Sequence, residues 1–346
     1  MEYGAIDLHM KKSAVRIVDE TGAVVHRERI ATTRDAFAAC FGGRPRMRIL
    51  LESSTESEWV AQVLEGVGHA VVVADPHYLP MYGSRNRRIK SDERDVTALG
   101  DANRVGVFRR AHRVGAERQA LRRLLTIRKH LVQQRSGLLS LVRTTLRQVG
   151  LRLGPGDPEH VEARLARLVI PDGVAASLAP VRAVLTTVNA ELATLEAQVD
   201  TLATADPVAQ RLMTAPGVGP VIALTFQAVL DNPARFDGDA RRVAAFLGVV
   251  PSESSSGERQ HKGHITKAGP TELRALLVQG SWVIWRGRSP EGAALRTWAH
   301  ALAERRGRRI AIVALARRLG RLLYAMWRDG TNFQGGHRRR ASRAAA

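Results

Sequence analysis

The chain has 346 residues, with 53 Lys or Arg against 33 Asp or Glu, so its formal net charge is +20. That length and a hydrophobic fraction of 45% allow roughly two packed domains and exclude a disordered basic tail. The sequence contains no apolar run of about 18 residues and no apolar signal core at its start, which predicts a cytoplasmic protein without a membrane partner. The excess of positive charge indicates a polyanionic partner.

The positive charge is concentrated in what we call the basic segment, Pro80 to Gly150. It holds 17 Lys or Arg and five Asp or Glu, a local charge of +12. Further cations cluster between Arg305 and Arg321 and in the tail that begins at His337. Such clustering predicts a nucleic-acid track whose binding weakens with salt, although an Arg-rich helix can also simply face solvent. Aromatic residues make up only 5%, so we expect phosphate contacts rather than base stacking.

The first hundred residues predict a mixed sheet. Short β-branched runs predict strands, and Glu56 to Leu64 has the apolar spacing of a helix. Three strands in succession, followed by strand, helix and strand, match the order of an α/β RNase H-like fold. The predicted strands are Tyr3 to Leu8, Ala14 to Val18, Val24 to Ile30, Arg48 to Leu51 and Ala70 to Ala74.

A long helical arm is predicted next. Ala116 to Val149 is a basic amphipathic helix, which Gly150 to Pro158 interrupts. In the second helix the apolar residues advance in alternating steps of four and three, which is typical of a coiled-coil seam. That seam pairs either with the preceding helix or with another protomer. Its residues are Val181, Leu185, Val188, Leu192, Leu195, Val199 and Leu202.

The C-terminal region is predicted to be mainly α-helical. Val208 to Thr214 and Val221 to Leu230 are expected to be helices joined by Ala215 to Pro220, which resembles a helix-hairpin-helix module. The hairpin residues Gly217 and Gly219 would let backbone amides approach a phosphate, although a tight turn without a ligand has the same sequence. The predicted domain ranges are 1–112, 113–205, 206–330 and a basic tail, 331–346.

Four acidic residues are candidates for a metal site. Asp7 lies in the first predicted strand and Glu52 at the end of the fourth, and these two strands are neighbours in an RNase H-like sheet. Asp92 and Asp95 follow at helical spacing, so both project from one side of a helix. Four carboxylates in one place would bind two Mg²⁺ ions, the arrangement that supports phosphodiester displacement. The only cysteine, Cys40, rules out an internal disulfide, and no Cys/His spacing typical of a zinc site accompanies it, so a thiolate metal site is not expected.

A serine segment, Ser252 to Gly257, is predicted to be a loop. It lies between an apolar element and a Gly-rich basic turn, so its hydroxyls would be held beside phosphate-binding cations, a setting for a nucleophile. A plain linker is the alternative. The cations expected to contact nucleic acid here and in the basic segment are Arg85, Arg87, Arg88, Lys90, Lys262, Lys267 and Arg274.

Taken in order, these motifs resemble the transposases of the insertion-sequence 110 family over about Tyr3 to Leu277. The motifs are Gly4-Ala5-Ile6-Asp7, Leu51-Glu52-Ser53, Lys90-Ser91-Asp92-Glu93-Arg94-Asp95, Ala215-Pro216-Gly217-Val218-Gly219, Ser255-Ser256-Gly257 and Ile265-Thr266-Lys267-Ala268-Gly269. The resemblance implies a RuvC-like DEDD domain, a coiled-coil dimerisation arm and a transposase domain with a nucleophilic serine.

The resemblance also implies roles for residues and partners. Asp7, Glu52, Asp92 and Asp95 would bind Mg²⁺, and Ser256, with Ser255 as the alternative, would form a phosphoserine link to DNA. Ser254 is an additional serine beside the motif. The implied partners are donor and target DNA, a structured noncoding guide RNA, and further copies of the chain in a nucleoid-associated dimer or tetramer.

Two other functions fit the same residues. A RuvC-like structure-specific endonuclease would use the acids and water only, and a non-catalytic protein would bind nucleic acid without cutting it.

Overall fold

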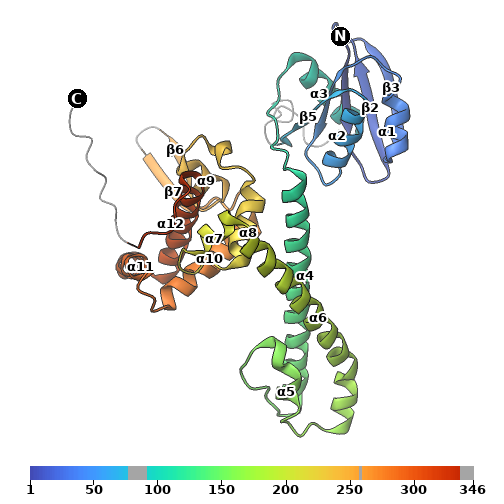
Figure 1. Ribbon diagram of the computed structural model, residues 1–346. Coiled ribbons are helices and arrows are strands. Elements are labelled where there is room, and N and C mark those ends of the chain that lie inside the picture. The colour runs from blue at the N-terminus through green and yellow to red at the C-terminus, as the bar shows by residue number, and fades with distance from the viewer. Residues whose placement is uncertain (77–91, 257–258, 336–346) are drawn as a thin grey trace, which may run out of the picture. The chain divides into compact units, whose positions relative to one another are not determined.

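The structure is a computed structural model that describes residues 1–76, 92–256 and 259–335 (Figure 1). Contacts divide the chain into two compact units, Met1–Val114 and Gly115–Ala346. The predicted domain limits at 205 and 330 both lie inside the second unit, because the helical arm makes its contacts with the C-terminal elements. Within the described ranges, no helix is long and apolar enough to cross a membrane.

The N-terminal unit is built on a five-stranded mixed sheet in the order β3-β2-β1-β4-β5. Strand β1 pairs antiparallel with β2 and parallel with β4, while β2 pairs antiparallel with β3 and β4 parallel with β5. The predicted mixed sheet is confirmed, and the strand order is the one that an RNase H-like α/β fold requires. The strands are β1 (Tyr3–Asp7), β2 (Lys12–Val18), β3 (Val24–Ala31), β4 (Arg48–Glu52) and β5 (Ala70–Ala74).

Helices cover both faces of this sheet. On one face, α1 (Arg34–Phe41) and α2 (Ser57–Gly66) pack on the larger side chains of the strands, such as Ile6 and Leu51. On the other face, α3 (Asp92–Val105) packs on smaller ones, such as Ala5. Period-two alternation along each strand produces this division, since adjacent residues point to opposite faces. Each large apolar side chain buried in this way contributes about 1.5–3 kcal/mol.

Helix α3 lies close to the sheet because small residues meet there. A Cβ placed on Gly100 would be 3.8 Å from the Cβ of Ala5, which is ordinary van der Waals contact. Near the C-terminal end of the helix, the buried Asn103 donates from Nδ2 to the carbonyl oxygens of Gly4 and Arg48 at 2.7 and 2.8 Å. Its Oδ1 accepts from Nε of Arg48 at 2.7 Å. These contacts fix the position of the helix that carries two of the acids.

Replacing Asn103 by Ala should therefore destabilise the N-terminal unit. The substitution leaves the buried carbonyl oxygen of Gly4 without this donor, which costs about 1–3 kcal/mol, and removes a second hydrogen bond to the partly buried carbonyl oxygen of Arg48. We expect a lower urea midpoint, and Val105→Ala, at a side chain that is 61% exposed on the same helix, provides the control. Equal midpoints for the two variants would contradict this role for Asn103.

The second unit begins with an arm of two long helices, α4 (Ala116–Gln148) and α6 (Asp172–Ala205), which lie side by side (Figure 1). Between them are a short 3₁₀ helix, η3 (Pro158–His160), and α5 (Val161–Leu165). Leu185, Leu192 and Val199, seven residues apart, are buried, whereas Leu202 is 44% exposed, so part of the predicted seam packs within the chain and the coiled coil stays a prediction. Pairing of the arm with a second protomer stays a prediction.

The C-terminal part is mainly helical, and one of its helices, α8 (Pro220–Leu230), is buried on most sides. Phe226 of α8 is fully buried, as is Tyr324, whose hydroxyl donates to the carbonyl oxygen of Pro233 at 3.0 Å. Its helices are α7 (Pro207–Met213), α8 (Pro220–Leu230), η4 (Pro233–Phe236), α9 (Ala240–Phe246), α10 (Thr271–Arg286), α11 (Ala293–Arg306) and α12 (Arg308–Asp329), and its strands are β6 (Pro251–Ser256) and β7 (Arg259–Ile265).

Candidate functional site

Asp7 and Glu52 lie beside each other at one edge of the sheet. They are the last residues of β1 and β4, parallel strands in which Ile6 pairs with Leu51. Alternation puts Asp7 on the same face as Ala5, and Glu52 on the same face as Leu50, which is the face that α3 covers. The strand order therefore brings together two carboxylates that are 45 residues apart in sequence.

Helix α3 adds the other two predicted acids. Asp92, Asp95 and Leu99 follow the helical period, and Asp95 and Leu99 are buried against the sheet, with Asp95 only 7% exposed. Asp92 is the first residue of the helix and forms an ion pair with Arg29 of β3 at 2.5 Å. Like-charge acids at the first turn are favoured by the helix dipole, which partly offsets their mutual repulsion.

The four acids interact electrostatically. Burial is the largest cause that raises the pKa of the Asp7 carboxyl, and the negative charges of Asp95, Glu52 and Asp92 raise it further, whereas His9 lowers it. Oδ2 of Asp7 is buried and accepts no hydrogen bond within the described part of the chain, although the imidazole of His9 lies within ion-pair distance of it. A buried carboxylate among three others is costly unless a cation accompanies it. We call these four residues the acid cluster.

His9 is a member of this site that sequence reasoning missed. Its Nε2 lies 3.2 Å from Oδ2 of Asp7 and 3.3 Å from Oδ1 of Asp92. The three side chains form a group whose potential ligand atoms all lie within 4.8 Å of one another. The sequence signal that could have identified His9 is its position two residues after Asp7, an acid that ends a buried strand.

The raised pKa of Asp7 predicts how the stability of the protein depends on pH without divalent metal. The folded state holds the proton more tightly than the unfolded chain, so stability falls as pH rises from the ordinary carboxyl value of 3.8 through the raised pKa. Asp7→Asn removes the buried charge, so this variant should have a higher melting temperature than wild type at pH 7 in chelator. The difference should shrink as the pH approaches 4. A variant that melts below wild type at pH 7 would contradict the assignment of a destabilising charge.

Several cations of the basic segment have a structural role, whereas its role as a nucleic-acid track stays a prediction. Arg113 binds Glu58 and Glu65, and these hydrogen bonds raise its pKa. Arg122 donates to the carbonyl oxygens of Ala228 and Val229 at the end of α8, and burial lowers its pKa. Four further cations of α4 are paired with acids: Arg118 with Asp206, Arg128 with Glu196, Lys129 with Glu272 and Arg135 with Glu159.

Other cations of the basic segment remain candidates for nucleic-acid contact. Arg123, Arg143 and Arg147 are exposed on α4. The predicted residues Arg85, Arg87, Arg88 and Lys90 lie outside the described residues.

The predicted helix-hairpin-helix corresponds to α7, a glycine turn and α8. Gly217 has a φ of 73°, and a Cβ there would lie 2.4 Å from the carbonyl oxygen of Gly280 on α10. Packing against α10 therefore accounts for Gly217. Gly219, in contrast, has open space around its Cβ position and precedes the first turn of α8. A phosphate role for either glycine stays a prediction.

The prediction that the serine segment is a loop is wrong. Pro251–Ser256 forms strand β6, which pairs antiparallel with β7. Ser256 ends the strand and pairs with Arg259, and Ser255 pairs with Gln260. The side chains of both serines and of Lys262 lie outside the described atoms. This serine hairpin, residues 251–265, therefore presents its predicted nucleophiles from a strand rather than from an irregular segment.

Two glycines hold the base of the serine hairpin. A Cβ on Gly248 would lie 2.1 Å from the carbonyl oxygen of Ala268, and one on Gly269 would lie 2.0 Å from that of Phe246, and both residues have positive φ. Arg274 donates to the carbonyl oxygens of Leu247 and Ala268 at 3.1 and 2.9 Å, which gives it a structural role. Lys267 is exposed in the same turn with a φ of 54°. Nucleic-acid contact by Arg274 and Lys267 stays a prediction.

Comparison with known proteins places both halves of the chain in one family. Residues 5–150, which include the whole acid cluster, match a DEDD transposase model of the IS110 family. Residues 209–296, which include the glycine turn and the serine hairpin, match the model described as transposase of the IS116/IS110/IS902 family.

Similar proteins cover the chain almost completely. A probable family 20 transposase of Pseudomonas aeruginosa is 28% identical and aligns over 97% of this chain and 100% of its own length. The transposase for insertion sequence element IS1111A of Coxiella burnetii is 26% identical over 89% of this chain and 85% of its own. The corresponding protein of IS1328 from Yersinia enterocolitica is 24% identical over 95% and 97%. Two domain models of the family match separate parts of this chain, and the transposases named here align with it over most of their length. This chain therefore belongs to the IS110 family of transposases.

Proposed function

We propose that this transposase cuts and rejoins DNA with two chemical groups, the acid cluster of the N-terminal unit and a serine hydroxyl of β6. The membership of the family makes the chain an enzyme of DNA transposition. The observation that carries the proposal is the convergence of Asp7 and Glu52 with the acids of α3 on one face of the sheet.

The residues of the acid cluster fit a divalent cation. Transposase domains of the DEDD type use divalent metal ions in general, and a cluster of carboxylate oxygens is the donor set that Mg²⁺ prefers. The buried Oδ2 of Asp7 without a hydrogen-bond partner in the described part of the chain supports this fit. Asp7, Glu52, Asp92 and Asp95 would hold Mg²⁺, which supplies charge neutralisation at the phosphate and activation of an attacking oxygen.

Neighbouring side chains orient the acid cluster. Arg29 contacts Asp92, and the imidazole of His9 lies between Asp7 and Asp92. Both contacts hold carboxylates in fixed directions, and the positive charge of Arg29 reduces the repulsion between them. His9 has a nitrogen donor and Mg²⁺ prefers oxygen, so we assign His9 to positioning of the acids rather than to binding of Mg²⁺.

Ser256 is the proposed nucleophile and Ser255 the alternative. The hydroxyl of Ser256 loses its proton as its oxygen forms a bond to phosphorus, and the phosphodiester bond to the adjacent nucleotide oxygen breaks. The released strand end takes up a proton and becomes a hydroxyl. Attack by the hydroxyl of another strand reverses these changes and frees the serine, so no external energy source is required.

The proposed partners are donor and target DNA, a structured guide RNA and further copies of the chain. RNA guidance and a dimer or tetramer come from the resemblance to the family and rest on no contact within the described residues. The exposed arginines of α4 support binding to a phosphate backbone, which RNA and DNA share. We therefore propose that the protein is associated with the DNA of the nucleoid.

The function is tested by a recombination assay with the purified protein, the nucleic acid that copurifies with it, and DNA that carries the element ends and a target. We expect joined DNA that depends on Mg²⁺, is lost in chelator and is lost after RNase treatment, and a defined structured RNA when the copurified nucleic acid is sequenced. Cleavage without joining and without a protein–DNA adduct would favour the endonuclease alternative. Binding without any cut product would favour a non-catalytic protein.

A further inference from the structure

The edge strand β3 has polar side chains where its buried face should be apolar. Ile30 points into the core that α1 and α2 cover, and alternation puts Glu28 and His26 on the same face. Their partners on β2 confirm this orientation, because His26 pairs with Ile17 and Glu28 with Val15, both fully buried in that core. Two ionisable residues thus continue an apolar face.

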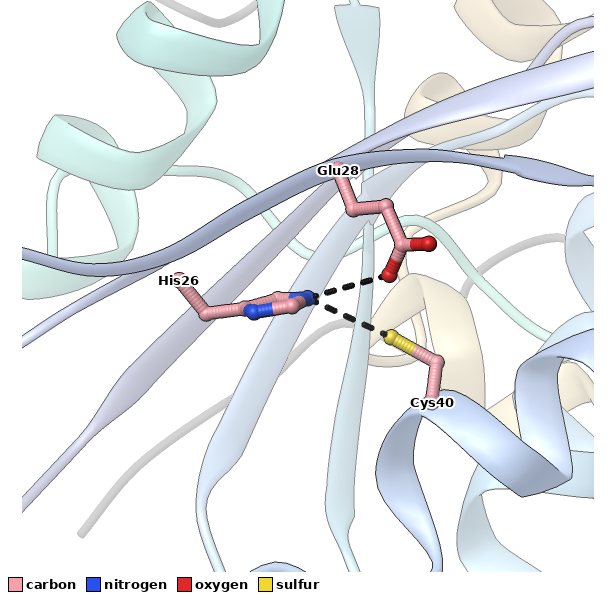
Figure 2. Close-up of side chains that lie close together, drawn as sticks. All are labelled: His26, Glu28 and Cys40. Atoms are coloured by element: carbon pink, nitrogen blue, oxygen red, sulfur yellow. Dashed lines mark hydrogen bonds and ion pairs between the residues drawn. The ribbon is translucent and has the colours of Figure 1, made fainter.

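Helix α1 brings a cysteine to these two residues. Cys40 belongs to the second half of α1, which packs on β3, and its side chain points toward His26 (Figure 2). Nε2 of His26 lies 3.9 Å from Sγ of Cys40 and 3.3 Å from Oε2 of Glu28. All three potential ligand atoms lie within 4.8 Å of one another.

These separations resemble those between ligands of one tetrahedral ion. With usual zinc bond lengths, neighbouring nitrogen and sulfur ligands lie roughly 3.6 Å apart, and nitrogen and oxygen ligands roughly 3.4 Å apart. The observed distances of 3.9 and 3.3 Å differ from these by a few tenths of an ångström. Small rotations of the side chains would therefore close the site on an ion.

The donor set selects a class of metal. A thiolate with an imidazole favours Zn²⁺ and other transition metals over Mg²⁺. A thiolate and a carboxylate together carry two negative charges, which match those of a divalent ion. Burial and the negative charge of Glu28 raise the pKa of the Cys40 thiol, and a bound dication would relieve the same repulsion.

We propose that His26, Glu28 and Cys40 form a second metal site, specific for Zn²⁺ or a similar transition metal and distinct from the acid cluster. Three protein ligands leave a fourth position for water. The site links edge strand β3 to helix α1, so a bound ion stabilises the N-terminal unit. His26 is 27% exposed and Glu28 53%, so the ion enters from solvent.

This site could not be predicted from the sequence, because the spacing rules for metal sites describe ligands that lie in short local loops. His26 and Cys40 are 14 residues apart on different elements, and a single cysteine excludes the common structural zinc motifs. The expectation that no thiolate metal site exists rested on residue spacing alone. Spacing does not show that β3 and α1 pack together, because this is a tertiary contact.

The test uses Co²⁺ as a spectroscopic probe on the full-length protein. We expect one equivalent of Co²⁺ to produce a thiolate charge-transfer band that Zn²⁺ displaces, together with a higher melting temperature in Zn²⁺. Cys40→Ser should abolish the band, and His26→Ala and Glu28→Gln should weaken Co²⁺ binding at least about tenfold. Asp7→Asn is the matched control, since it alters the acid cluster, contains no sulfur ligand and should leave the band intact.

Three results would overturn the proposal. The first is the absence of a band with excess Co²⁺ in the folded wild-type protein. The second is a band that His26→Ala and Glu28→Gln both leave unchanged, which would indicate adventitious binding to the thiol. The third is a band that Asp7→Asn abolishes, which would place the ion elsewhere. His26→Ala keeps the test decisive where Cys40→Ser fails to fold.

Discussion

Replacing Asp7 by Asn should reduce DNA strand cleavage by at least about a hundredfold while leaving the protein folded. The substitution keeps the size of the side chain but removes the charge at the centre of the acid cluster, where Asp95, Glu52 and Asp92 all act on Asp7. Binding to DNA should change little, because no basic residue is altered. Cleavage is measured as Mg²⁺ is titrated, and saturating Mg²⁺ should not restore the rate.

Glu93→Gln provides the matched control for Asp7→Asn. Glu93 lies between Asp92 and Asp95 in sequence but is exposed and pairs with Arg27, so it does not belong to the cluster. This control should cleave DNA at nearly the wild-type rate. Loss of activity in Asp7→Asn together with its expected gain in thermal stability would separate a functional role from misfolding. Wild-type cleavage by Asp7→Asn would refute the proposed site.

The N-terminal sheet was predictable because its signals are local. Short β-branched or apolar runs indicate the strands, and a sheet of this order puts the ends of β1 and β4 side by side, which is why Asp7 and Glu52 could be paired from sequence. Helix α1 was not predicted, although the sequence contains a helix-start signal. That signal is the N-cap residue Thr33, whose side chain accepts a hydrogen bond from the amide of Ala36. With eight residues, it is too short to show several helical periods.

What the sequence did not predict depends on tertiary contacts. His9 and the His26, Glu28 and Cys40 group are assembled from different elements, so no spacing rule finds them. Net charge likewise does not distinguish the half-buried Arg122, which donates hydrogen bonds to carbonyl oxygens at the end of α8, from an exposed arginine on the same helix. The serine segment was expected as a loop because serine has no strong strand preference, and pairing with β7 decides its conformation.

Ser256→Ala should abolish the covalent protein–DNA intermediate and lower the yield of joined DNA by at least about a thousandfold. The alanine removes only the hydroxyl oxygen that would bond to phosphorus, and pairing of the strand backbone with Arg259 does not need that oxygen. The adduct is detected as protein that migrates with labelled DNA after denaturation. Asp7→Asn should lose the adduct as well, since the proposal requires both groups.

The neighbouring serines serve as controls for Ser256→Ala. Ser255→Ala and Ser252→Ala alter the same strand, and both should retain the adduct. Retention in Ser256→Ala with loss in Ser255→Ala would transfer the role of nucleophile to Ser255. Wild type and all three variants could instead cut DNA without forming any adduct. In that case water is the nucleophile and the acid cluster acts alone.

A mixture of the two inactive variants tests whether protomers cooperate. The serine hairpin and the acid cluster belong to different units of the chain, so Ser256→Ala and Asp7→Asn are mixed in equal amounts. Recovered adduct in that mixture would show that one protomer supplies the serine and another the acids.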